Sequence, residues 1–186
     1  MMNVPSPWVQ RFAALIPAGE VLDLACGSGR HARLLAALGH AVLAVDRDPA
    51  ALLCAAGPGI VTQACELEAP AAALHDPGWP FAAQRFAAIV VCNYLHRPLM
   101  AALLNSLKPD GVLIYETFSL GNAHFGKPSN PDFLLAPGEL LSALAASRMR
   151  VVAFEEGVVA APKPAMLQRL CAVGPDFPSM AALLAP

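Results

Sequence analysis

The chain has 186 residues, of which 56% are hydrophobic and 14% are charged, and its formal net charge is −2. One domain of this length can bury a sizeable core, and no apolar run reaches the ~18 residues that a membrane span requires. The chain has no basic run of the kind that nucleic-acid-binding proteins usually show. Its first residues lack the pattern of a secretory signal. We therefore expect a single cytoplasmic domain over residues 1–186, with no membrane or nucleic-acid partner.

The cysteines and histidines are scattered along the chain, with no C-x-x-C pair and no metal-ligand spacing. Widely spaced cysteines in an odd number favour reduced thiols over a disulfide framework. The pattern therefore predicts no metal site.

In chain order, short apolar runs alternate with alanine- and leucine-rich stretches. After an N-terminal helical extension over residues 1–19, we expect strands at 20–25, 41–46, 60–64 and 87–92, and helices at 30–38, 49–56 and 99–107. Residues 69–84 are rich in proline and predict a loop with room for a short helix. A turn at 108–111 and a strand at 112–116 follow. This alternation predicts an open parallel sheet with helices on both faces.

The pattern changes in residues 117–137, which mix asparagine, glycine, proline and aromatic residues without periodicity. A loop of this length in a compact domain is usually functional or disordered, so we expect it on the substrate side; an ordinary ordered loop is the alternative. A helix at 138–146 precedes strands at 150–159 and 166–173, whose short connection predicts an antiparallel pair. The complete expectation is an α/β fold: a doubly wound, mostly parallel seven-stranded sheet with an antiparallel C-terminal strand.

A glycine-rich turn, Gly27-Ser28-Gly29, follows the first strand and opens a helix. Glycine lets the backbone turn sharply and lets a ligand approach, and the helix start behind it favours negative charge. Asp46 ends the second strand, where a carboxylate can accept hydrogen bonds from both hydroxyls of a ribose. The combination predicts an adenosine-type cofactor; a tight turn beside a surface acid is the simpler alternative.

Asp23 lies in the middle of the first strand, where a dinucleotide-binding strand normally stays apolar. The turn formally matches G-x-G-x-x-A, which is a weak signal for a nicotinamide cofactor. A carboxylate before the turn instead suits a ligand with a cationic head, such as the ammonium of S-adenosylmethionine. The alternative is a buried acid bound to backbone amides.

Residues 21–29 resemble the first motif of class I methyltransferases, and residues 44–49 resemble the second. Residues 86–92 and 107–114 are similar to the later strands of that family. The similarity covers residues 8–173 and is nearest to small bacterial methyltransferases of the tellurite-resistance type. It implies a Rossmann-like fold with S-adenosylmethionine as the methyl donor and S-adenosylhomocysteine as the product.

The resemblance also implies which residues contact the cofactor. Asp23 would face the methionyl amine, Asp46 would hold the ribose, and Arg47 would border the adenine. An acid beside the adenine amine would be Glu66, although a shift of one residue would put Cys65 there. The expected cofactor residues are Asp23, Ala25, Cys26, Gly27, Gly29, Asp46, Arg47, Glu66, Leu67 and Asn93.

His96 and Tyr94 follow the fourth strand and are the candidate catalytic residues. His96 could act as a base because its ordinary pKa is near neutrality, and Tyr94 could orient an acceptor; both could equally be packing residues of a loop. The stretch is not Asn-Pro-Pro-Tyr or Asp-Pro-Pro-Tyr, which argues against methylation of an exocyclic base amine.

The leading hypothesis is methyl transfer to a small molecule or a metalloid anion, because the chain has no basic patch and no appended recognition domain. The alternatives are a protein or RNA methyltransferase that acts with a partner subunit, and a cofactor-binding module without turnover. A nicotinamide oxidoreductase comes last, because no acid–base pair for hydride chemistry stands out. The oligomeric state is left open.

Overall fold

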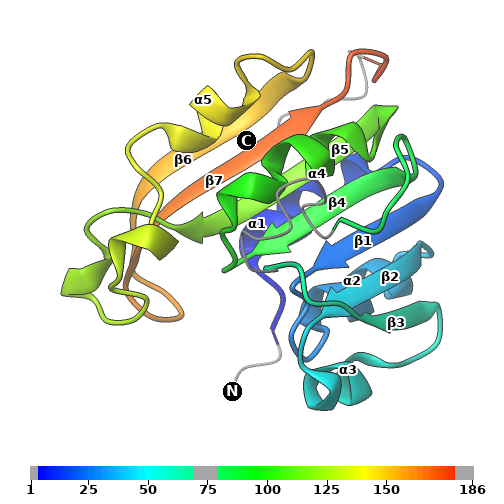
Figure 1. The fold of residues 1–186 in the computed structure, drawn as a ribbon, viewed down its shortest axis with the longest axis horizontal. Coiled ribbons are helices and arrows are strands. Elements are labelled where there is room, and N and C mark those ends of the chain that lie inside the picture. Colours follow the sequence, from blue (N-terminus) through cyan, green and yellow to red (C-terminus); the bar gives the residue numbers. More distant parts are fainter. Residues whose placement is uncertain (1–3, 69–78, 179–186) are drawn as a thin grey trace.

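The computed structural model of the protein describes residues 4–68 and 79–178. Its centre is a seven-stranded sheet with the order β3-β2-β1-β4-β5-β7-β6 (Figure 1). The five parallel strands are β1 (Glu20–Leu24), β2 (Ala41–Asp46), β3 (Ile60–Ala64), β4 (Phe86–Cys92) and β5 (Leu107–Phe118). β7 (Ala165–Val173) runs antiparallel to both β5 and β6 (Arg150–Val159). The predicted sheet, with its antiparallel C-terminal strand, is confirmed.

Helices cover both faces of the sheet (Figure 1). On one face, α1 (Pro7–Phe12), α2 (Arg30–Ala37) and α3 (Pro49–Ala55) bury apolar side chains in one core cluster. On the other face, α4 (Met100–Asn105) and α5 (Glu139–Leu144) pack in a second cluster. All seven residues of β4 are buried, as expected for a central strand with helices on both faces.

The strand order reverses between β1 and β4, since the chain moves outward through β2 and β3 and then returns to the other side of β1. In an open α/β sheet, such a reversal leaves a crevice at the carboxyl ends of the two strands, and ligands bind there. The fold therefore directs attention to the residues that follow β1 and β4.

Two predicted elements differ in the structure. The helix predicted at 99–107 is shorter, because a 3-10 turn, η2 (Arg97–Leu99), precedes α4. The turn predicted at 108–111 lies inside β5: Phe86 pairs with Leu107 and Ala88 with Val112, so the strand bulges between these pairs. The amide of Gly174 donates to the Gly111 carbonyl at 2.8 Å. Gly174, which is distant in sequence, thus keeps residues 108–111 in the sheet. The local turn propensity of these residues did not indicate such pairing.

Residues 117–137 are ordered. β5 continues to Phe118, and two 3-10 turns follow, η3 (Asn122–His124) and η4 (Pro131–Phe133). The loop closes on itself where Ser119 forms a bridge with Leu135. The N-terminal residues from 4 onward form α1 and a 3-10 turn, η1 (Ala13–Leu15). Of the loop predicted at 69–84, residues 69–78 lie outside the described residues, and residues 79–84 contain no helix.

Within the described ranges, no helix has the length and apolar character needed to cross a membrane.

Candidate cofactor site

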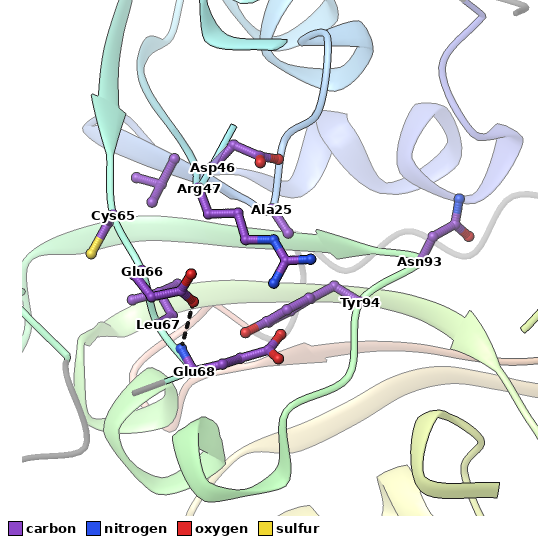
Figure 2. A pocket seen from close by; sticks show the side chains of 10 residues that line it. Ala25, Asp46, Arg47, Cys65, Glu66, Leu67, Glu68, Asn93 and Tyr94 are labelled. Atoms are coloured by element: carbon purple, nitrogen blue, oxygen red, sulfur yellow. Dashed lines mark hydrogen bonds between the residues drawn. The ribbon is translucent and has the colours of Figure 1, made fainter. Parts of the chain in front are cut away.

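A pocket of about 270 Å³ opens at the carboxyl ends of β1, β2, β3 and β4 (Figure 2). It lies at the reversal of strand order, where this type of fold binds its ligands. Its lining combines carboxylates, one guanidinium, one phenol and aliphatic side chains. The lining residues are Ala25, Val45, Asp46, Arg47, Cys65, Glu66, Leu67, Glu68, Asn93 and Tyr94.

Two lining residues hold a backbone conformation that only glycine adopts easily. Ala25 has φ 53° and Asn93 has φ 58°, both in the left-handed region. Ala25 follows β1 and Asn93 follows β4, so each turns the chain sharply away from its strand at the mouth of the pocket. Strained residues of this kind cost about 1–3 kcal/mol each and cluster at ligand sites. The crevice is therefore built by two abrupt strand ends.

Asp46 joins the first two motifs of the sequence. One carboxylate oxygen, Oδ2, accepts the Gly27 amide at 2.7 Å, and Oδ1 accepts the Asp48 amide at 3.0 Å. An ionised carboxylate has about four acceptor positions, so both oxygens can take further hydrogen bonds from a ribose diol. The side chain thus fixes the glycine turn and still presents acceptors to the pocket.

The two glycines of the turn have different physical roles. Gly27, with φ +53°, donates to Asp46, and a Cβ there would meet no atom within 4 Å. Gly29, with φ +78°, has no such room: a Cβ would lie 2.6 Å from the Cβ of Ala55. The glycine at 29 therefore lets the start of α2 approach the end of α3.

Asp23 is 1% exposed and does not line the pocket. Its Oδ2 accepts the Ala32 amide of α2 at 2.9 Å, which is the arrangement of the structural alternative. Burial raises the pKa of this carboxyl to about 7, against the opposing effects of the Ala32 hydrogen bond and Arg30. A cation beside Asp23 would stabilise the charged form of the carboxyl group. Contact between Asp23 and the methionyl amine of the cofactor stays a prediction.

The far wall of the pocket carries the acids that follow β3. Glu66 Oε1 accepts the Glu68 amide at 3.1 Å, which folds this segment back on itself. Figure 2 shows the Tyr94 phenol reaching toward Glu68, with the Arg47 guanidinium extending over the pocket. Burial raises the pKa of the Tyr94 phenol, and the negative charge of Glu68 adds to the shift. The phenol is therefore neutral and faces the Glu68 carboxylate (Figure 2).

The segment after β4 is held by side chains. The buried Tyr115 hydroxyl donates to the Tyr94 carbonyl at 2.9 Å. Arg97 pairs in a bidentate way with Glu139, at 2.6 and 2.9 Å, and donates to the carbonyls of Asp132 and Leu134. Arg97 thus ties this segment to the 117–137 loop and to α5.

Seven of the predicted site residues line the pocket: Ala25, Asp46, Arg47, Glu66, Leu67, Asn93 and Tyr94. Cys26, Gly27 and Gly29 form the adjoining turn, and Asp23 lies behind it. His96 lies outside the lining, and the described residues give its imidazole no hydrogen-bond partner. Its role as a base therefore stays a prediction.

The sequence-based set lacked Val45, Cys65 and Glu68. Val45 directly precedes Asp46, and Glu68 is two residues after Glu66, so the signal for both was adjacency to a predicted residue. No group of three or more His, Cys, Asp or Glu side chains could share a metal ion within residues 4–68 and 79–178.

These side chains fit the adenosine part of S-adenosylmethionine. Carboxylates of Asp46, Glu66 and Glu68 can accept from ribose hydroxyls and from an adenine amine, while Val45 and Leu67 offer apolar surface to a base.

Comparisons with known proteins agree with this fit. A family model described as a methyltransferase domain matches residues 21–111, which contain every residue of the pocket. No curated protein is a significant match to the chain.

Solved structures share the fold at low identity. An S-adenosylmethionine-dependent methyltransferase from Methanosarcina mazei is 16% identical with a TM-score of 0.67, covering 92% of this chain and 98% of that one. TehB from Haemophilus influenzae is 16% identical with a TM-score of 0.71, covering 91% and 62%. Geranyl diphosphate C-methyltransferase from Streptomyces coelicolor is 15% identical with a TM-score of 0.63, covering 89% and 78%. Together, the methyltransferase-domain match over residues 21–111 and the shared fold support assignment of the chain to the class I S-adenosylmethionine-dependent methyltransferases.

Proposed function

We propose that the chain transfers the methyl group of S-adenosylmethionine to a small-molecule acceptor at the carboxyl edge of the sheet. The observation that carries the proposal is the 2.7 Å hydrogen bond between the Gly27 amide and Asp46, at the pocket between β1 and β2. In this proposal Asp46 holds the ribose, Glu66 and Glu68 face the adenine, and Asn93 borders the reactive end. When bound, the cofactor supplies an electrophilic methyl group on a sulfonium.

In this proposal the residues of the chain act mainly by positioning the cofactor and the acceptor, and less by transferring protons. Methyl transfer needs an acceptor atom aligned behind the sulfonium, and alignment in a suited electrostatic environment can supply much of the rate. The neutral Tyr94 phenol faces Glu68 across the pocket, so in this proposal it forms part of the wall that holds the cofactor. His96 would be needed as a base only for acceptors that hold their proton until the transfer.

The outer part of the carboxyl edge favours an anionic acceptor. Lys127, in the 117–137 loop, and Lys163, in the connection between β6 and β7, are exposed and form no ion pair with the described residues. The Lys163 ammonium lies 3.3 Å from the position that a Cβ on Gly126 would take, beside Lys127 in sequence. Two exposed cations in neighbouring segments, with no acid paired to either among the described residues, suit a small anion. Geranyl diphosphate C-methyltransferase, which shares the fold, is named for such an acceptor.

The cofactor is tested by calorimetric titration of the full chain with S-adenosylmethionine, S-adenosylhomocysteine and NAD. We expect the first two to bind and NAD not to bind. Asp46→Asn should weaken binding about tenfold or more, because a hydrogen bond to a charged acceptor is lost. Asp48→Asn is the matched control, since its side chain caps α3 outside the pocket. Equal binding by both variants, or preference for NAD, would contradict the proposal.

The acceptor is tested by incubating the protein with methyl-labelled cofactor and separate panels of small anions, neutral small molecules, peptides and RNA. We expect labelling of a small anion, with KM raised and kcat preserved in Lys127→Ala and Lys163→Ala. Labelling of peptides or RNA would favour the alternative of a macromolecular acceptor with a partner subunit. Cofactor binding without transfer in any panel would favour a non-catalytic module. The single-domain organisation and a cytoplasmic location stay predictions.

A further inference from the structure

A buried histidine lies between the N-terminal segment and the cofactor motif. His31, in the first turn of α2, is 2% exposed. Its Nε2 accepts the Ser6 amide at 3.1 Å, and its Nδ1 lies 4.0 Å from Asp23 Oδ1. A neutral imidazole has one N–H and one acceptor nitrogen, so acceptance at Nε2 puts the proton on Nδ1, facing the carboxylate. Burial lowers the pKa of His31 to about 3, which keeps the ring in this neutral form.

Both ends of this line of contacts, Ser6 and Asp23, hold structural elements. At one end, Ser6 is 5% exposed, and its hydroxyl accepts the Trp8 amide at 3.1 Å as the N-cap of α1. α1 is fixed on the sheet by Trp8, whose indole N–H donates to the Leu170 carbonyl. At the other end, Asp23 binds the Ala32 amide through Oδ2. The start of α1 is therefore joined to the cofactor turn through one side chain, His31.

Residues 4–6, the described residues before α1, lie at the edge where β1 and β4 end (Figure 1). An acceptor must approach the sulfonium from this edge, since the pocket and the strand-order reversal both lie there. If the Asp23 carboxylate moved, the His31 ring beside it would shift as well. The hydrogen bond between the ring and the Ser6 amide would then change. Among the described residues, Asp23 is the one carboxylate within ion-pair distance of His31, and the neighbouring Arg30 guanidinium helps to lower the pKa of the ring.

We propose that His31 is a positioning residue that couples cofactor binding at Asp23 to the docking of residues 4–6 and of α1. The coupling rests on the proposed function, in which Asp23 serves the cofactor. Because such coupling is reciprocal, the cofactor should order the N-terminal segment, and loss of N-terminal docking should weaken the cofactor to the same extent.

The test removes the coupling hydrogen bond far from the cofactor. Ser6 has φ −58°, which is the angle that proline adopts, so Ser6→Pro is compatible with the backbone at residue 6. It deletes the N–H that donates to His31 and puts the ring Cδ in its place, so residue 6 can no longer dock on the imidazole. Ser6→Ala is the matched control, because it loses the same capping hydroxyl and keeps the N–H. Titration with S-adenosylhomocysteine should show about three- to tenfold weaker binding for Ser6→Pro than for Ser6→Ala.

Hydrogen exchange supplies a second readout that a merely structural role would not move. In the native protein, S-adenosylhomocysteine should increase the protection of amides 8–12. This increase should disappear in His31→Leu and return in His31→Gln, whose amide oxygen can accept from Ser6. Equal affinity of the two Ser6 variants, with unchanged protection of α1 on binding, would overturn the coupling. Absence of binding by the native protein would instead contradict the proposed function.

Discussion

The wall of the pocket that follows β1 is held by contacts within a short stretch of chain, whereas the wall that follows β4 is held by distant residues. Gly27 and Asp46 are 19 residues apart, and Asp23 and Ala32 are 9 apart. Arg97, in contrast, reaches Glu139 across 42 residues. The first wall can form once β1, α2 and β2 are in place. The second needs the 117–137 loop and α5 as well, so the two walls should respond differently to substitution.

The largest effect is expected where backbone packs against backbone in the first wall. Gly29→Ala should lower the free energy of unfolding by about 2–5 kcal/mol, because the left-handed φ costs about 1–2 and the clash with Ala55 about 1–3. Gly39→Ala is the control, since Gly39 has φ +92° and nothing within 4 Å of its Cβ position. Urea denaturation measures both. Equal losses would mean that Ala55 yields and that only φ matters.

The buried pair behind the first wall predicts two opposite pH dependences. The folded pKa of Asp23, about 7, is above its ordinary 3.8, so its contribution to stability falls as pH rises through this window. The folded pKa of His31, about 3, is below 6.5, so the unfolded state takes up the proton and stability falls as pH drops through that window. The two slopes oppose each other between about pH 4 and 6.5.

When either Asp23 or His31 is replaced, the unfolding free energy should depend on pH only through the group that remains. The slope should be at most about 1.4 kcal/mol per pH unit. Asp23→Asn should make the protein lose stability more steeply on acidification, because His31 then acts alone. His31→Leu should reverse the slope, since Asp23 gains stability as it binds a proton. Unfolding free energies from urea titrations between pH 4 and 7 check both. Identical slopes in the three proteins would refute the opposition.

In the second wall, Arg97→Gln should lower the free energy of unfolding by about 1–2 kcal/mol, since the ion pair is half-exposed and only part of its energy is net. Hydrogen exchange should locate the loss. The amides of Leu120 and Leu135, which bond across the ends of the 117–137 loop, should exchange faster. Arg148→Gln is the control, because Arg148 is exposed and forms no ion pair among the described residues. Unchanged exchange at Leu120 and Leu135 would show that the loop does not depend on Arg97.

The same contrast explains what could be predicted from the sequence. The strands from residues 20 to 92 and the acid at Asp46 are local features, and they were predicted within one or two residues. The extension of β5 through residues 108–111 depends on the amides of Gly174 and Asp176, more than 60 residues away, which no local pattern contains.

Asp23 shows the limit within the first wall. The sequence marks an unusual acid in an apolar strand, but the hydrogen bond to Ala32 depends on the position of α2 against the sheet. Glu68 shows the limit across the pocket: it faces Tyr94 from beyond the end of β3, although β2 and β1 separate β3 from β4 in the sheet, so only the folded pocket brings the two side chains together. In both cases the sequence could not predict the direction of a side chain, because hydrophobic periodicity does not specify it.

The smallest effect distinguishes support of the second wall from its contact with the ligand. Tyr115→Phe removes one buried hydroxyl and leaves the Tyr94 carbonyl without its donor, so the free energy of unfolding should fall by about 1 kcal/mol. Tyr94→Phe removes the same group from a half-buried ring that faces Glu68, and its stability should change by less than about 0.5 kcal/mol. Binding of S-adenosylhomocysteine should show the reverse order, because only the Tyr94 phenol lines the pocket. If Tyr115→Phe weakened binding of S-adenosylhomocysteine as much as Tyr94→Phe, the hydrogen bond to the Tyr94 carbonyl would also position the Tyr94 phenol. Support of this wall and its contact with the ligand would then depend on the same hydrogen bond.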